Sequence, residues 1–266
     1  MINIPMKVTE SYDRNNISSL SRAKVCPALS RQSISSAGAF SAQTSRTAAS
    51  GTRAAQGTSA PRTTQAPQTP PPAAAPYRKP PALRNLIQKG QKVNVGAAGQ
   101  LKAIRIAMGW NTSDSRCDID LSAFLLDASG KVPGDDWFVF YGQAKSPDGS
   151  VSLNTDGSAE DRETADIDLV RLNPGIKKIV FVLTINEAFT YHLNFSMVKD
   201  AYIRLLEPDT GRELYSFRLT DYYANVTSMM LGELYLYNGT WKFNAVGNGV
   251  AKDLEGLCGL YGVQTN

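Results

Sequence analysis

The feature that most constrains the fold is a succession of short apolar segments separated by turn residues, which fills the chain from about residue 83 onward. Residues 101–108 alternate apolar and polar side chains, as a strand with one buried face does. Residues 119–126 and 179–185 are apolar on both faces and predict buried strands. Asn238-Gly239 between two further apolar segments is the strongest short signal for a β-hairpin.

Helix is favoured at only two places, as a short turn at residues 196–200 and as a final helix at residues 251–261. Many strands joined by tight turns, with little helix between them, indicate sheets packed face to face. We therefore predict an all-β fold, an antiparallel two-sheet β-sandwich with one or two short helices.

The first 81 residues differ in composition from the rest of the chain. They hold 10 of the 14 prolines, and Ser, Ala, Thr, Gln and Arg dominate the remainder. Such a segment cannot bury enough apolar surface to offset the entropy lost on ordering. We predict a disordered basic tail over residues 1–81, ending in a proline-rich linker over residues 60–81, and one β-sandwich domain over residues 82–266.

Charge is divided unevenly between these two parts. Up to Asn85 the chain carries 11 Lys or Arg against two acidic residues, a net charge of +9, which leaves −5 for the rest. A basic tail favours an acidic protein, a nucleic acid or an anionic membrane surface, although its cations form no dense cluster. A solvated tether is the simpler interpretation. No run of 18 apolar residues occurs, and we expect a cytoplasmic protein.

Two acidic motifs point to a hard cation. Asp118 and Asp120 are two residues apart in an extended segment, so their carboxylates would face the same side. The second motif is a loop over residues 154–163. Counted from Ser152, its residues occupy positions 3, 5, 6, 9 and 12 of a twelve-residue calcium loop: Asn154, Asp156, Gly157, Glu160 and Glu163.

The first position of that pattern is Ser152, where a calcium loop has Asp, and the residues before it resemble a strand rather than a helix. A helix-loop-helix calcium hand is therefore excluded. The simpler interpretation of the loop is a solvated acidic hairpin, and a cation site is the functional one.

Catalytic chemistry finds little support in the sequence. His192 is the single histidine, and it has no serine nucleophile motif nearby. The cysteines Cys26, Cys117 and Cys258 are odd in number and include no Cys-x-x-Cys pair, which argues against a disulfide framework or a structural zinc site. We expect a protein that is not an enzyme.

Seven short motifs follow one another along the predicted domain: MGW at residues 108–110, DIDLSAFLLD at 118–127, FVFY at 138–141, SPDGSV at 146–151, GELY at 232–235, NGTWKF at 238–243 and LYGV at 260–263. In this order they closely resemble the TerD family of tellurium-resistance and stress-response proteins. The resemblance covers residues 83–264 and does not extend to the tail.

The resemblance implies a two-sheet β-sandwich that binds calcium without known catalysis, in bacterial responses to tellurite and other stresses, with related stress-response proteins as partners. The expected ligands are Asp118, Asp120, Asn154, Asp156, Glu160, Asp161 and Glu163. The loop is shorter than the family pattern and Arg162 interrupts its closing acids, so one calcium ion, two ions or weak binding all remain open. The alternative is a calcium-independent scaffolding module that binds an acidic partner, a nucleic acid or an anionic membrane surface through its basic tail.

Overall fold

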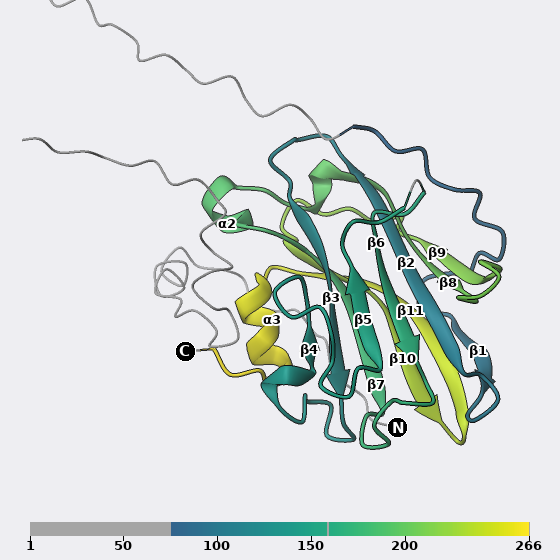
Figure 1. Cartoon of the computed structure of the whole chain (residues 1–266). Coiled ribbons are helices and arrows are strands. Elements are labelled where there is room, and N and C mark those ends of the chain that lie inside the picture. Colours follow the sequence, from purple (N-terminus) through teal and green to yellow (C-terminus); the bar gives the residue numbers. More distant parts are fainter. Residues whose placement is uncertain (1–75, 159, 266) are drawn as a thin grey trace, which may run out of the picture.

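The computed structural model describes residues 76–158 and 160–265, so the tail predicted for residues 1–81 lies, up to residue 75, outside the described residues. Within them, eleven antiparallel strands form two sheets that face each other (Figure 1). The six-stranded sheet has the order β1 (Lys92–Ala97), β11 (Thr240–Val250), β10 (Ser228–Tyr237), β7 (Lys178–Ile185), β3 (Ile119–Leu126) and β4 (Phe138–Val139). The five-stranded sheet has the order β5 (Val151–Asn154), β6 (Glu163–Asp168), β2 (Ala103–Thr112), β8 (Val198–Leu206) and β9 (Glu213–Arg218).

The predicted antiparallel β-sandwich is therefore confirmed, as is its low helix content. The described residues contain two short α-helices, α2 (Ala188–Tyr191) and α3 (Leu254–Tyr261). The turn expected at residues 196–200 is a 3-10 turn at Phe195–Met197. The final helix begins at Leu254 because the Asp253 side chain accepts a hydrogen bond from the Gly256 N–H and so caps its first turn. None of these helices is long and apolar enough to cross a membrane.

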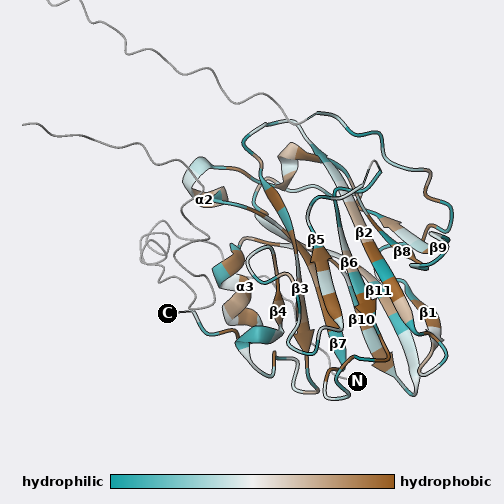
Figure 2. Cartoon of the chain, viewed as in Figure 1, coloured by the Kyte–Doolittle hydropathy of each residue, from teal (hydrophilic) through white to brown (hydrophobic). Residues whose placement is uncertain are grey.

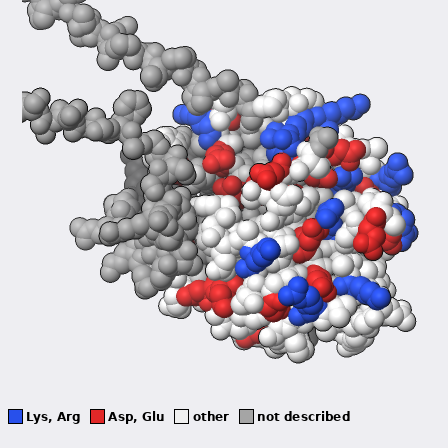
Figure 3. All heavy atoms as spheres, viewed as in Figure 1, with Lys and Arg blue, Asp and Glu red and all other residues white. Residues whose placement is uncertain are grey.

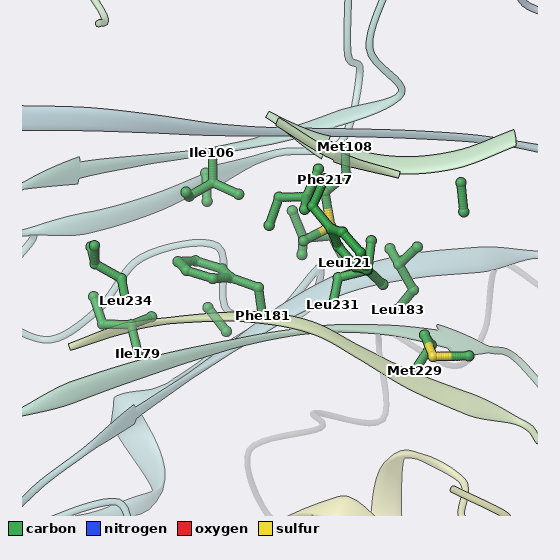
Figure 4. Packing of buried hydrophobic residues seen from close by; sticks show 14 of the residues in the cluster. Ile106, Met108, Leu121, Ile179, Phe181, Leu183, Phe217, Met229, Leu231 and Leu234 are labelled. Carbon is green, nitrogen blue, oxygen red and sulfur yellow. The ribbon is translucent and has the colours of Figure 1, made fainter. Parts of the chain in front are cut away.

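The main core lies between the two sheets. Figure 4 shows Ile106 and Met108 of β2 directed toward Phe181 of β7 and Leu231 of β10 across this space. Strand β3 is apolar on both faces because its two faces pack against different layers. Leu121 and its alternate neighbours join the main core. Phe124 and Leu126 lie on the other face of the sheet in a second cluster with Leu257 and Tyr261 of α3.

Turn chemistry sets the strand register. Asn238 and Gly239 both have positive φ, 49° and 71°, which is the requirement of the two-residue turn that matches strand twist. They join β10 to β11 with Tyr237 opposite Thr240, as the sequence predicts. Figure 2 shows hydrophobic and hydrophilic residues alternating along several of the strands.

Two boundaries depart from the sequence pattern. The aromatic FVFY motif at residues 138–141 forms a strand of only two residues, β4, because Phe140 turns back to bridge Gln143. The acidic loop expected at residues 154–163 ends one residue earlier, because Glu163 is already the first residue of β6 and pairs with Met108 of β2. This second difference places a carboxylate inside the sandwich.

Candidate functional site

Three of the predicted ligands come together where β3 and β6 begin, and we call Asp118, Asp120 and Glu163 the acidic cluster. Asp118 is exposed and immediately precedes β3, and its backbone carbonyl accepts a hydrogen bond from the Asn186 N–H at 2.8 Å. Asp120 is the second residue of β3 and is half-buried. Glu163 is buried, and its Oε2 accepts a hydrogen bond from the Leu121 N–H at 2.8 Å. The Glu163 carboxylate therefore reaches from one sheet to the other.

The electrostatics of the acidic cluster reflect this burial. Burial raises the pKa of Glu163 to about 8, and the nearby Asp120 and Asp118 add to the rise, while the hydrogen bond from Leu121 opposes it. Burial, followed by the charge of Asp118, raises the pKa of Asp120 to about 6. Both shifts mean that negative charge is poorly compensated at this position, and a bound cation would compensate it.

The acidic loop, residues 154–158 and 160–162, is folded tightly on itself. The Asn154 side chain accepts a hydrogen bond from the Asp156 N–H, and the Ser158 N–H donates to the Asp161 carbonyl at 2.7 Å. Gly157 has a φ of +67°, and a Cβ at this position would lie 2.0 Å from the Arg162 carbonyl oxygen. Only glycine fits there without moving the backbone. Asn154 and Asp156 are exposed within this turn.

The remaining two predicted ligands lie on the outer face of the five-stranded sheet. The Asp161 carboxylate is bound by the Arg204 guanidinium of β8 at 2.5 Å and by the Tyr202 hydroxyl at 3.1 Å. Glu160 also contacts Arg204, at 3.1 Å. Burial lowers the pKa of Arg204, but its hydrogen bond and charge contact with Asp161 outweigh this and raise it. Asp161 and Glu160 are thus compensated by a protein cation, unlike the acidic cluster.

No pattern in the sequence predicted this role for Arg204. The sequence does indicate which face of the sheet Arg204 occupies. Arg204 alternates with the buried Ile203 and Leu205 along a strand, which places it on the outer face. The partner, 43 residues earlier in the chain, could not be identified from such a pattern. Over the part of the molecule that is described, Figure 3 shows acidic and basic side chains interspersed rather than gathered in a field of one sign.

A cavity of about 330 Å³, which no pattern in the sequence predicted, lies beside Asp120. Its walls come from β3, β7, the segment after β4, α2 and the start of α3, and they include Tyr141, Glu187 and Glu255. Glu187 has a positive φ of 46°, a backbone conformation that is uncommon for residues other than glycine. In the sequence, Glu187 was marked only by its position two residues after the buried strand β7.

Carboxylate and amide oxygens are the ligands that calcium prefers, so the donor set of the acidic cluster fits that ion chemically. Within residues 76–158 and 160–265, no three Asp, Glu, His or Cys side chains are close enough to form a metal-binding group as they stand. The cluster could hold a cation only if its side chains drew closer together.

The fold and the site together define a class of antiparallel β-sandwiches that carry a carboxylate cluster where two facing strands begin. A protein-family model, the TerD domain, matches residues 84–261. The chain belongs to the TerD family, which confirms the resemblance seen in the sequence.

Several relatives are similar over almost their full length. The tellurium resistance protein TerD of an Alcaligenes species is 39% identical over 189 residues, 68% of this chain and 98% of its own length. General stress protein 16U of Bacillus subtilis is 36% identical over 187 residues, 67% of this chain and 97% of its own length. A crystal structure of a TerD homologue from Streptomyces coelicolor covers 58% of this chain and 94% of its own, with 20% identity and a TM-score of 0.46.

Proposed function

We propose that this protein is a calcium-binding, non-enzymatic interaction module of a bacterial stress response such as tellurite resistance. The stress-response part rests on family membership and on relatives named for tellurium resistance and general stress. The calcium part is carried by the acidic cluster, in which Asp118, Asp120 and Glu163 meet from distant parts of the sequence. A cytoplasmic setting belongs to the same proposal.

In this proposal the carboxylates of Asp118, Asp120 and Glu163 hold the ion, with Asn154 and Asp156 as further oxygen ligands. Calcium takes six to eight oxygen ligands in flexible geometry, whereas magnesium demands a smaller and more regular set. A cluster that must draw together around the ion therefore favours calcium. Because the ion binds the folded state, it also stabilises that state by mass action.

The test is a calcium titration of the full chain by calorimetry, with magnesium in a parallel titration. We expect saturable heat with calcium, a preference over magnesium and a raised melting temperature. Asp118→Asn combined with Asp120→Asn should weaken calcium binding at least tenfold, because two of the three charges of the acidic cluster are lost.

A matched control is Asp209→Asn, which removes an exposed carboxylate from the turn between β8 and β9. This variant should bind calcium as the unmodified protein does. If the double variant instead retained full calcium affinity, the acidic cluster would not be the site.

The alternative proposal is a calcium-independent scaffold that binds an acidic protein, a nucleic acid or an anionic membrane surface through the basic residues before the domain. The observation that favours it is the separation of charge, +9 up to Asn85 and −5 afterwards. Binding of this kind would weaken steeply with salt and would be indifferent to calcium.

A further inference from the structure

The segment before the first strand is attached to the domain by paired contacts. The Arg78 N–H donates to Oδ1 of Asn111 at 2.9 Å, and Nδ2 of Asn111 donates back to the Arg78 carbonyl at 2.8 Å. Asn111 lies on β2 and is only 5% exposed. One buried amide side chain thus binds both backbone groups of Arg78, which fixes the position of this segment as a strand neighbour would.

The same segment also contacts the acidic loop. Nη1 of Arg78 donates to the carbonyl oxygens of Ser158, at 3.0 Å, and of Asp161, at 3.2 Å. From the loop side, Nη2 of Arg162 donates to the Pro76 carbonyl at 3.4 Å. The contacts therefore run in both directions between residues 76–78 and the loop.

Arg162 is itself held in place by β2. Its Nε donates to the Trp110 carbonyl, and its guanidinium lies over the Trp110 ring, 5.8 Å from the centroid. The charge of Arg78 contributes to lowering the pKa of Arg162, after the larger effect of burial. Two guanidinium groups are thus close neighbours beside the loop in which calcium ligands are expected.

Residues 76–78 lie outside the part of the chain that the family model matches, which begins at residue 84, whereas the residues they contact lie inside it. Residues 76–78 are also the first described residues at the end of the basic tail. A structural connection therefore exists between the tail and the acidic loop.

We propose that residues 76–78 form a strap that holds the acidic loop closed and keeps its cation affinity low until the strap is released. Arg78 occupies two backbone carbonyl oxygens of the loop, and a backbone carbonyl is a group that a hard cation can bind. Its positive charge also opposes the arrival of a second cation. This inference rests on the proposed calcium function and adds its regulation.

Release of the strap and binding of the cation must each favour the other. If the strap and the cation compete for the loop, a partner that pulls the tail away raises cation affinity, and a bound cation loosens the strap by the same factor. A stress-response partner of the tail would then be coupled to calcium binding without touching the acidic cluster.

The experiment uses the full chain with Arg78→Ala, and with Lys79→Ala as the matched control, because Lys79 is the next cation and is exposed. Amide hydrogen exchange of peptides covering the acidic loop is measured in calcium-free buffer, and calcium is titrated by calorimetry. Arg78→Ala should speed exchange in the loop and tighten calcium binding by about fivefold or more. Lys79→Ala should change neither.

If Arg78→Ala left amide hydrogen exchange in the acidic loop unchanged, the proposed strap would be wrong, whether or not calcium binds. If exchange became faster but calcium affinity stayed equal or fell, the strap would not compete with the cation for the loop. Faster exchange in a protein that shows no calcium heat in any variant would support the strap as a loop clamp and contradict the proposed calcium function. Arg78→Gln, which keeps a polar side chain, serves in the same measurements if Arg78→Ala lowers the melting temperature.

Discussion

At the scale of single residues, the buried contact between Asp161 and Arg204 shows that not all of the predicted ligands have the same role: Asp161 supports the structure. The two side chains are 6% and 11% exposed, and the Tyr202 hydroxyl completes the contact. Tyr202 can lie there because Gly109 has no side chain, and a Cβ on Gly109 would fall 2.3 Å from the Tyr202 hydroxyl oxygen. The predicted ligands thus divide into Asp161 and Glu160, which are paired with Arg204, and the acidic cluster, which has no such cation partner among the described residues.

Asp161→Ala should lower the free energy of unfolding by about 3 kcal/mol, because it leaves the Arg204 charge buried with a poorer partner. Urea unfolding followed by circular dichroism measures this change. Glu160→Gln is the control, since that side chain is 62% exposed and its contact with Arg204 should contribute less than about 1 kcal/mol. Equal losses in the two variants would contradict the distinction.

At the scale of elements, helix α3 covers one face of the six-stranded sheet. Leu257, Cys258 and Tyr261 of the helix are buried, and the centroids of the Tyr261 and Phe124 rings lie 4.5 Å apart. This cover is why β3 is apolar on both faces although only one of them faces the main core. Figure 1 shows α3 beside β3 and β4.

Leu257→Ala should cost about 2–5 kcal/mol of unfolding free energy, because it opens a cavity in the cluster beneath α3. The matched control is Leu260→Ala in the same helix, whose side chain is exposed and should change stability by about 0.5 kcal/mol or less. Chemical denaturation of both variants compares them directly. Similar losses for the two would mean that α3 is not packed as described.

Elements with strong periodicity were predictable from the sequence, and elements defined by distant contacts were not. Strand β3 and the hairpin at Asn238-Gly239 follow from local patterns. Strand β6 could not be predicted because it follows a polar loop and begins with the ionisable Glu163, whose burial involves a hydrogen bond from Leu121 of the facing sheet. Likewise Asp118 and Asp120 could be predicted as a pair, whereas their meeting with Glu163 depends on how the two sheets face each other.

At the scale of the whole molecule, the acidic cluster makes stability depend on pH. Glu163 ionises near its ordinary value of 4.5 in the unfolded chain, but only at about 8 when folded. Between these values the folded state holds a proton that the unfolded state has lost. Stability must therefore fall as pH rises through this range, by up to about 1.4 kcal/mol per pH unit for one such group.

In buffer with a calcium chelator, the free energy of unfolding should decrease between pH 5.5 and 7.5, as measured by urea titrations at several pH values. Glu163→Gln should flatten this decrease, because glutamine can still accept the Leu121 hydrogen bond but does not titrate. Asp209→Asn should keep the slope of the unmodified protein. If Glu163→Gln kept the same slope of unfolding free energy against pH, groups other than Glu163 would cause the pH dependence.

The lengths of the outermost strands have a consequence for how copies of the molecule meet. A long, flat outermost strand offers unpaired backbone groups on which another chain can add a strand and begin an aggregate. Here β4 has two residues and β5 has four, β1 is interrupted by a bulge between Asn94 and Gly96, and Leu86 bridges to β9. Each border of the two sheets is short, bent or partly covered, so the sandwich presents little template for strand addition by a second copy.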